Sequence, residues 1–269
     1  MDREGVLMVG GMLRMDQAAT VPAARMPTKL VLFDIDGTLS PNGDFAACLT
    51  KAAEEVLGIT ITPDSEKARI KMGSTIGQWV IDATEKAGVP KDRVREIADS
   101  VLALAEEHFA KTLAASALKP YEGVAELLKE LTARGDVVIG IVTNNLNGVM
   151  YLKMESNGLL AYFTTDGIME SASMLGDKSG SMKVAISKAE EKFGVTFDRG
   201  SIFYVGDHVS DMKAGKAVGI KTIGVGTGRS TLGELANAGA DIVVAGLSDS
   251  KTVLAFIDAG KVPQKSRCT

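Results

Sequence analysis

The stretch Lys29-Leu-Val-Leu-Phe-Asp34-Ile-Asp36-Gly37-Thr38 decides how the rest of the chain is interpreted. Its apolar run stops at two aspartates and a glycine. This pattern is typical of a buried parallel strand that ends at a functional loop, because helices cover both faces of such a strand. We therefore predict a first strand that begins at Lys29, with a polar site directly after it.

Strands and helices alternate from Pro120 onward. A helix that begins at Pro120 and ends before Gly135 precedes an apolar strand, and further strand-like runs follow with helices between them. The predicted strands are 137–142, 162–164, 201–205, 220–225 and 241–244, and the predicted helices between them include 150–157, 182–193 and 212–218. This alternation predicts an α/β fold, a three-layer doubly wound parallel sheet, whose ligand site lies beyond the carboxyl ends of the strands.

The segment between the first two strands is different. Residues 45–118 contain no run rich in Val and Ile, and several glycines and prolines interrupt them, so we predict helices there. The resulting division is a helical insert at 42–118, a core made of 27–41 and 119–260, a flexible extension at 1–26 and a polar tail at 261–269. Hinges are expected near Ser40–Asn42 and Leu118–Pro120.

Composition excludes several classes of protein. The chain has 269 residues, 45% of them hydrophobic, and a net charge of -4, so binding to nucleic acid or to an anionic membrane is not expected. No apolar run reaches the roughly 18 residues that span a bilayer. Cys48 and Cys268 lie far apart, which predicts no disulfide framework and favours a cytoplasmic location. An organellar transit peptide in residues 1–26 is the alternative.

Polar residues cluster directly after the predicted strands. Asp34 and Asp36 follow the first, Thr143-Asn144-Asn145 follows the second, and Gly206-Asp207-His-Val-Ser-Asp211 follows the fourth. Four carboxylates in one pocket repel each other unless a cation neutralises them, so we predict a divalent metal. Oxygen ligands alone favour Mg²⁺, which often shares phosphate oxygens with its substrate.

The ordered set Asp34-x-Asp36-Gly37-Thr38, Thr143, a downstream lysine and Gly206-Asp207-x-x-x-Asp211 resembles the haloacid dehalogenase (HAD) superfamily of phosphohydrolases. The similarity covers about Lys29 to Val244, and the run after Gly206 looks most like the phosphoglycolate phosphatase-like branch. The resemblance implies a Rossmann-like HAD core with an inserted α-helical cap between its first two motifs.

The resemblance also implies a role for each residue. Asp34 would be the nucleophile, and Asp36 would be the general acid and base. The metal ligands would be Asp34, Asp36 through its backbone carbonyl, Asp207 and Asp211, although Asp211 could also serve simply as a helix cap. The phosphoryl group would be bound by Thr143, by the backbone of Asn144 and Asn145, and by the loop at Gly37.

Two further features of the site stay open between alternatives. The catalytic lysine is Lys183 or Lys178, and we favour Lys183 because we predict that it opens a helix. In the helical insert, the run Lys71-Met-Gly73-Ser74-Thr75 resembles a substrate-binding cap loop, but an ordinary turn between helices has the same composition.

The expected activity is that of a Mg²⁺-dependent phosphoric monoester hydrolase acting on a small phosphorylated metabolite, with phosphoglycolate as the leading substrate and a monomer or homodimer as the active form. A phosphomutase of the β-phosphoglucomutase type is the alternative, because it uses the same aspartate pair. A 2-haloacid dehalogenase would lack Asp36. A phospho-receiver protein would lack the helical insert.

Overall fold

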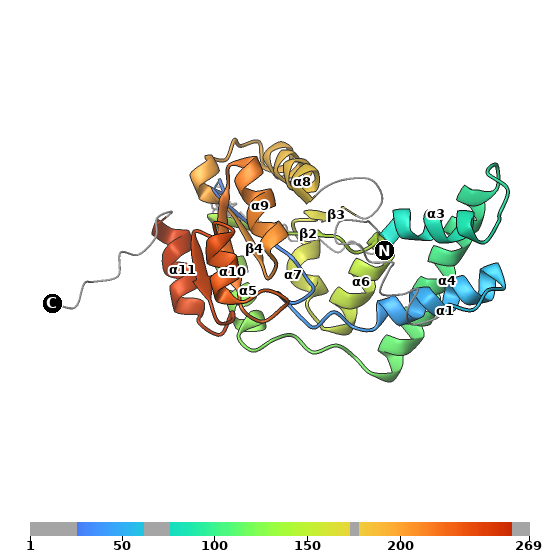
Figure 1. The fold of residues 1–269 in the computed structure, drawn as a ribbon. Helices are drawn as coiled ribbons and strands as arrows, with labels where there is room; N and C mark the ends of the chain where they lie inside the picture. Colours follow the sequence, from blue (N-terminus) through green and yellow to red (C-terminus); the bar gives the residue numbers. More distant parts are fainter. Residues whose placement is uncertain (1–25, 62–75, 173–177, 260–269) are drawn as a thin grey trace, which may run out of the picture.

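The computed structural model describes residues 26–61, 76–172 and 178–259 (Figure 1). Its centre is one six-stranded sheet with the order β3-β2-β1-β4-β5-β6, in which all neighbouring strands are parallel. The strands are β1 (Lys29–Phe33), β2 (Val137–Thr143), β3 (Met169–Ser171), β4 (Ile202–Gly206), β5 (Lys221–Val225) and β6 (Ile242–Val244). This is the order of a doubly wound fold, so the predicted fold class is confirmed.

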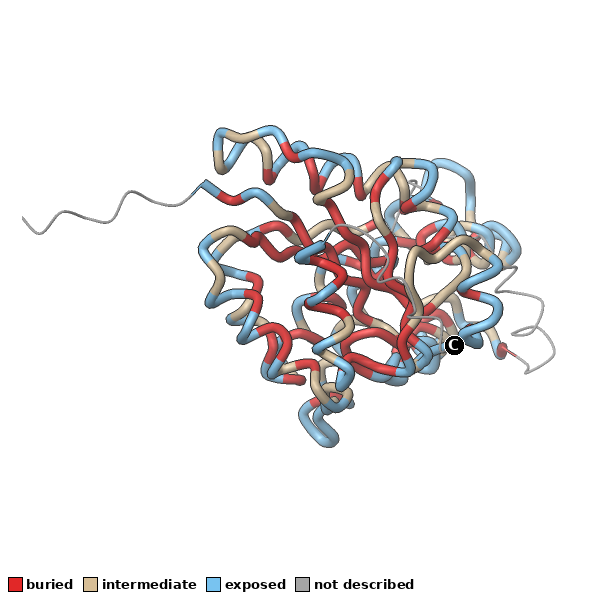
Figure 2. Tube along the Cα trace, turned by 90° about the vertical axis from the view of Figure 1, so that its left-hand side faces the viewer, coloured by how far each residue is buried: buried red, intermediate tan, exposed pale blue. Residues whose placement is uncertain are grey.

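Helices cover both faces of the sheet, and successive residues of β1 alternate between the two layers. Val31 and Phe33 pack on one side, and Leu30 and Leu32 pack on the other. The first side is covered by α5 (Val124–Ala133), α7 (Leu160–Thr164) and α11 (Ser250–Ala259), and the second by α8 (Lys178–Phe193) and α9 (Val209–Val218). Figure 2 shows the buried strands running through the middle of the molecule. None of the helices in the described ranges is long and apolar enough to cross a membrane.

Three helices between β1 and β2 form a separate apolar core, and we call them the helical unit. They are α1 (Phe45–Leu57), α3 (Ile76–Lys86) and α4 (Val94–Ala115), and they lie at one end of the molecule in Figure 1. The core of this unit also includes Leu146 and Val149, which belong to or precede α6 (Asn147–Ser156) of the α/β unit. The helical unit and the α/β unit are therefore joined through the apolar side chains at the start of α6.

The chain leaves and re-enters the α/β unit at neighbouring points. The backbone N–H of Tyr121 donates to Leu39 O at 2.9 Å, and the N–H of Leu118 donates to the Ser156 hydroxyl at 3.0 Å. One predicted hinge is therefore hydrogen-bonded to the α/β unit through Leu118, and the residues that flank the two hinges, Leu39 and Tyr121, are hydrogen-bonded to each other.

Two predicted elements were wrong. Residues 162–164 belong to α7 rather than to a strand, because Phe163 is buried edge-on against Phe33 beneath the sheet, and the third strand is 169–171 instead. The helix predicted from Met182 begins at Lys178. The earlier start of α8 changes which lysine lies in the candidate site. The two remaining short helices are α10 (Leu232–Asn237) and the 3-10 turn Arg199–Ser201.

Candidate active site

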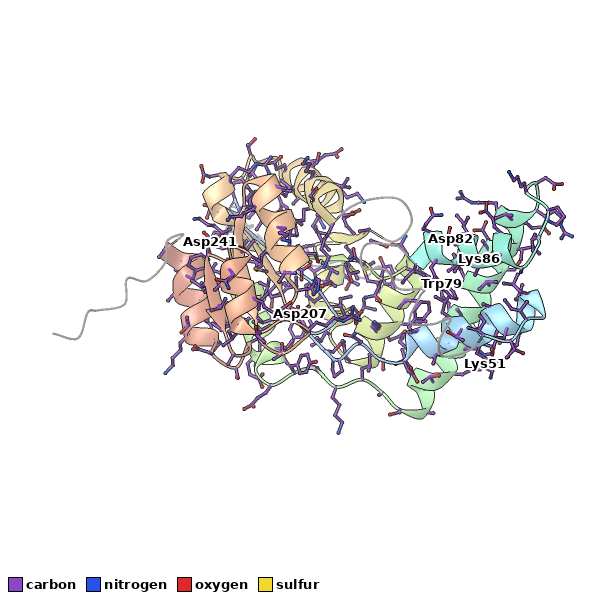
Figure 3. The ribbon with its side chains drawn as sticks, in the orientation of Figure 1. Lys51, Trp79, Asp82, Lys86, Asp207 and Asp241 are labelled. Atoms are coloured by element: carbon purple, nitrogen blue, oxygen red, sulfur yellow. The ribbon has the colours of Figure 1, made fainter. Side chains whose placement is uncertain are left out.

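The predicted motif residues meet at the carboxyl ends of β1, β2 and β4. The order of the strands reverses between β1 and β4, so loops diverge there and leave room for a ligand. The backbone N–H of Asp34 donates to Val205 O at 2.9 Å, which fixes the end of β1 against β4. In Figure 3, Asp207 lies between Asp241, on the far side of the α/β unit, and Trp79 in the helical unit. The site therefore lies on the side of the sheet that faces the helical unit.

Asp34, Asp207 and Asp211 form a buried carboxylate cluster. One oxygen from each lies within 4.8 Å of the others, which is close enough for all three to contact one cation. The donors are all carboxylate oxygens, as Mg²⁺ prefers, so these residues fit the predicted metal. Burial and repulsion from Asp34 raise the pKa of Asp211 to about 6, despite the opposing effect of Lys178. Burial also raises the pKa of Asp207, against the effect of a backbone N–H from Arg229.

The carboxylate of Asp36 lies outside this cluster. The prediction that Asp36 contributes a metal ligand through its backbone carbonyl stays a prediction.

Lys178, and not the favoured Lys183, lies against the aspartates. Its Nζ donates to Asp34 Oδ2 at 2.7 Å and to Asp211 Oδ1 at 2.6 Å. Lys183 is exposed on the same helix. Our preference for Lys183 assumed that the helix begins near it, whereas α8 begins five residues earlier. The structure therefore brings Lys178, and not Lys183, into contact with the predicted nucleophile and with Asp211.

Lys178 is buried. Burial alone would lower its pKa, but Asp211 and Asp34 outweigh this effect and raise the pKa well above its usual value. Its Nζ also lies 5.5 Å from the centroid of the Tyr204 ring, and the Tyr204 hydroxyl donates to Val142 O at 2.8 Å. Tyr204 thus supports the ammonium from inside the sheet, a role that was not predicted.

Asp36 belongs to a second polar network. Lys153 Nζ donates to Asp36 Oδ1 at 2.5 Å, and Asn145 Nδ2 donates to Asp36 Oδ2 at 3.1 Å. Burial raises the pKa of Asp36, and the ion pair with Lys153 opposes this rise. The two motif-one aspartates therefore have different partners, since Asp34 contacts Lys178 and Asp36 contacts Lys153.

Lys153 was missed by the sequence analysis. It lies on α6, four residues after the buried Val149 and directly before the buried Met154. The signal was a lysine within an apolar helical stripe, which usually indicates a side chain whose charged end reaches water.

The loop after β2 turns Thr143 and Asn145 inward and leaves Asn144 exposed. The Thr143 hydroxyl accepts from Asn145 Nδ2 at 2.9 Å and from the Asn145 N–H at 3.3 Å. The backbone N–H of Asn145 is therefore already used within the loop, contrary to the role predicted for it. The Asn145 side chain contacts Asp36, which was not predicted. Ser171 also donates to Asn145 O and so fixes this loop to β3.

Gly37 and Gly228 pack closely against Asp207. Gly37 has a φ of +75°, and a Cβ there would lie 2.5 Å from Asp207 Oδ2. A Cβ on Gly228 would overlap the same carboxylate. The N–H of Gly37 donates to Ser40 O at 2.9 Å, so in this structure Gly37 closes the turn and does not present that donor to a phosphate.

Asp211 has the capping role considered for it and also contacts the buried Lys178, while its role as a metal ligand stays a prediction. Its Oδ2 accepts from the backbone N–H of His208 at 3.1 Å at the start of α9, and its Oδ1 accepts from Lys178. His208 itself caps α9 and contacts the Ser210 hydroxyl. Capping thus holds Asp211 in the position where it also contacts the buried lysine.

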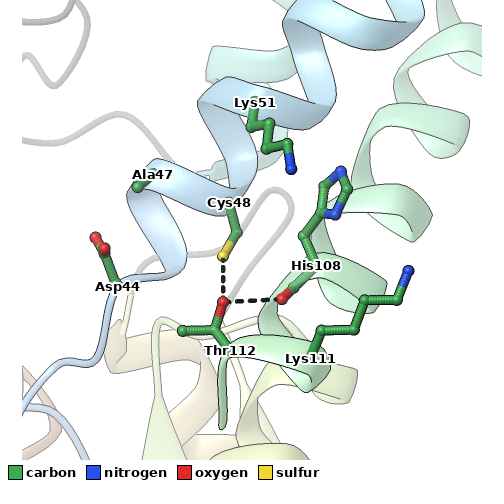
Figure 4. A pocket seen from close by; sticks show the side chains of 7 residues that line it. All are labelled: Asp44, Ala47, Cys48, Lys51, His108, Lys111 and Thr112. Carbon is green, nitrogen blue, oxygen red and sulfur yellow. Dashed lines mark hydrogen bonds between the residues drawn. The ribbon is translucent and has the colours of Figure 1, made fainter. Parts of the chain in front are cut away.

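The predicted cap-loop residues Lys71, Gly73 and Ser74 lie outside the described residues. A pocket does occur elsewhere in the helical unit, between α1 and α4 (Figure 4). There Cys48 contacts the Thr112 hydroxyl at 3.6 Å, and that hydroxyl donates to His108 O. The residues that line the pocket are Asp44, Ala47, Cys48, Lys51, His108, Lys111 and Thr112, and none of them is a predicted site residue.

Several solved structures share this fold. They include a HAD hydrolase of family IA, variant 3, from Entamoeba histolytica HM-1:IMSS, with a TM-score of 0.62 and 20% identity over 86% of this chain and 99% of that one. A predicted phosphoglycolate phosphatase from Haemophilus somnus 129PT has a TM-score of 0.58 and 21% identity over 84% of this chain and 97% of that one. A candidate β-phosphoglucomutase from Thermotoga maritima has a TM-score of 0.55 and 20% identity over 84% of this chain and 98% of that one.

Sequence comparison assigns the family independently of the fold. A search of curated protein sequences gave no significant match. The family model described as haloacid dehalogenase-like hydrolase matches residues 31–225, which include the end of β1, the helical unit and the strand ends that carry Asp34, Thr143 and Asp207. The match covers well over half of the sequence, and the chain therefore belongs to the haloacid dehalogenase-like hydrolases.

Proposed function

We propose that the protein is a Mg²⁺-dependent phosphomonoesterase that forms an aspartyl-phosphate on Asp34. The observation that carries this proposal is the separation of the two motif-one carboxylates. Asp34 contacts Lys178 beside the carboxylate cluster, whereas Asp36 contacts Lys153 and Asn145. Two carboxylates in distinct environments can serve as nucleophile and as acid and base in one reaction.

In the first half of the reaction, an Asp34 oxygen attacks phosphorus while the ester P–O bond breaks. The backbone N–H of Ile35 and Lys178 Nζ contact the Asp34 oxygens at 2.9 and 2.7 Å and would orient them. The leaving oxygen takes a proton from Asp36. In the second half, Asp36 takes a proton from water, the water oxygen attacks phosphorus, and the bond to Asp34 breaks to release inorganic phosphate.

Asp34, Asp207 and Asp211 would hold the Mg²⁺, with the Asp36 carbonyl as a further ligand. When bound, Mg²⁺ supplies positive charge that stabilises the phosphoryl oxygens. Thr143 and the exposed loop residue Asn144 would contact those oxygens from the opposite strand end, and Lys178 would add a fixed positive charge.

We propose phosphoglycolate or a similar small phosphoester as the substrate, because a structure of the same fold is described as a predicted phosphoglycolate phosphatase. The family motifs bind phosphate and metal, so the remainder of the substrate must be recognised elsewhere, and the helical unit faces the site. Its predicted loop 71–75 is the part of that unit which we expect to contact the substrate.

The test is phosphate release from a panel of small phosphoesters, with and without Mg²⁺, by the wild type and by Asp34→Asn. Asp198→Asn is the matched control, since Asp198 is an exposed cap of a 3-10 turn and asparagine can cap equally well. We expect Mg²⁺-dependent release that Asp34→Asn abolishes and Asp198→Asn retains. No release from any ester would overturn the proposal, and isomerisation of a sugar phosphate without release would assign a phosphomutase instead.

A further inference from the structure

Asp36 is held in place by a closed network of three side chains. Lys153 Nζ donates to Asp36 Oδ1 at 2.5 Å and to Asn145 Oδ1 at 3.0 Å. Asn145 Nδ2 in turn donates to Asp36 Oδ2 at 3.1 Å. Both carboxylate oxygens therefore have a donor, and the two donors fix each other. Each carboxylate oxygen has two lone pairs, so a position on each oxygen stays open for a proton.

Lys153 is enclosed as deeply as an apolar core residue. Its side chain is 1% exposed, whereas that of Asp36 is 29% exposed. Phe109 of the helical unit covers the ammonium from the other side, with Nζ 5.8 Å from the ring centroid. Enclosure strengthens the ion pair because water does not screen it. Burying the ammonium without a paired carboxylate would cost folding free energy.

We propose that Lys153 is a positioning residue for Asp36, which holds the exposed edge of that carboxyl group toward the leaving oxygen of the substrate. The inference rests on the proposed function. In the first step the ester P–O bond breaks as the bond from Asp34 to phosphorus forms, and the leaving oxygen receives its proton from Asp36. Lys153 takes no part in bond formation and acts only through the orientation of Asp36.

This role has a chemical consequence that a purely structural role lacks. An alkyl alcohol leaves poorly without a proton, whereas p-nitrophenolate leaves readily as an anion. If Asp36 is wrongly oriented, phosphoryl transfer to Asp34 from an alkyl phosphate should therefore slow far more than transfer from p-nitrophenyl phosphate, whereas the later attack of water is the same step for both esters. Proton transfer by a positioned side chain typically contributes 10²–10⁴-fold.

The experiment compares wild type, Lys153→Met and Lys153→Arg on phosphoglycolate or the best alkyl ester of the panel, and on p-nitrophenyl phosphate, with Mg²⁺ present. For Lys153→Met we expect about a 100-fold loss of kcat/KM on the alkyl ester and at most about a threefold loss of kcat/KM on the aryl ester, because kcat/KM reports phosphoryl transfer to Asp34 and not the later activation of water by Asp36. Lys153→Arg should restore part of the loss on the alkyl ester. In the Asp36→Asn background, Lys153→Met should cause no further loss, because both changes remove the same step.

Lys221→Met is the matched control. Lys221 forms a half-buried pair with Asp241 at 2.9 Å, but it lies at the start of β5, at the opposite end of the sheet from the site. It should change kcat on both esters by less than about twofold. If Lys153→Met does not fold, as judged by circular dichroism, the Lys153→Arg comparison across the two esters carries the test.

Equal losses of kcat/KM on both esters, or losses of kcat/KM that add to those of Asp36→Asn, would overturn the role of Lys153 while leaving the phosphatase intact. Absence of turnover of either ester by the wild type would instead reject the proposed function, and the inference with it.

Discussion

At the scale of single residues, two lysines of α8 have opposite environments. Lys178 contacts Asp34 and Asp211, whereas Lys183 lies exposed. Lys178→Met would leave two buried carboxylates without their cation and would remove a positive charge from the phosphoryl site. We expect kcat to fall about 100- to 1000-fold, by analogy with loss of a preorganised donor. Steady-state kinetics with Mg²⁺ checks this.

Lys183→Met is the comparison in the same helix, and it should change kcat by less than about twofold. A large loss with Lys183→Met and a small loss with Lys178→Met would restore the original assignment of the catalytic lysine.

The protonation of Asp211 predicts how Mg²⁺ binding depends on pH. Burial raises the pKa of this carboxyl to about 6, so a proton competes with the metal below that pH. The Mg²⁺ affinity should therefore weaken by up to about tenfold for each pH unit below 6, and isothermal titration calorimetry would measure it.

In the metal-free protein, the stability of the fold depends on pH in the opposite direction to Mg²⁺ affinity. A carboxyl with a raised pKa binds its proton more tightly in the folded chain, so its contribution to the free energy of unfolding falls as the pH rises from about 4 to 6. Mg²⁺ affinity that is constant from pH 5 to pH 8 would contradict this account.

At the scale of elements, the loop after β5 supports the metal site. The N–H of Arg229 donates to Asp207 Oδ2 at 2.8 Å, and a side chain on Gly228 would overlap that carboxylate. Gly228→Ala should displace Asp207 and weaken Mg²⁺ binding by about 10- to 100-fold, as loss of a partner of a metal ligand does. Titration calorimetry at pH 8 checks the affinity.

Gly233→Ala is the matched control for this prediction. Gly233 lies in α10, a few residues further along, and a Cβ there meets nothing within 4 Å. Mg²⁺ affinity should be unchanged, because alanine fits this helix at least as well as glycine. Equal effects of the two alanines would show that the loop does not position Asp207.

At the scale of the whole molecule, apolar side chains of α4 and α6 join the helical unit to the α/β unit. Phe109 of α4 is fully buried, packs edge-on against Phe45 and belongs to the same apolar cluster as Val149 of α6. Both units should therefore unfold together in the wild type. Phe109→Ala should lower the free energy of unfolding by about 3–5 kcal/mol and uncouple the two units.

Trp79, the single tryptophan of the sequence, lies in α3 of the helical unit, so its fluorescence reports that unit, while circular dichroism reports the whole chain. In urea the two curves should coincide for the wild type and separate for Phe109→Ala, with the fluorescence midpoint lower. Phe256→Ala removes a buried ring of α11 on the far side of the α/β unit and should shift both curves together. Curves that still coincide for Phe109→Ala would refute the coupling role of this contact.

The sequence by itself determined five of the six strands of the sheet and the positions of the aspartates. Each depends on a local pattern, since an apolar run ends at Asp34 or at Asp207 wherever the rest of the chain packs. Parallel strands then bring their carboxyl ends to one edge whatever the details of the helices. Only the tertiary structure decided which lysines contact the aspartates. Lys178 and Lys183 are about 140° apart around a helix at 100° per residue, so the start and packing of α8 select between them. Lys153 lies in an apolar stripe and is recognisable as a partner of Asp36 only once α6 packs beneath the helical unit, because burial turns an ordinary surface charge into a fixed donor.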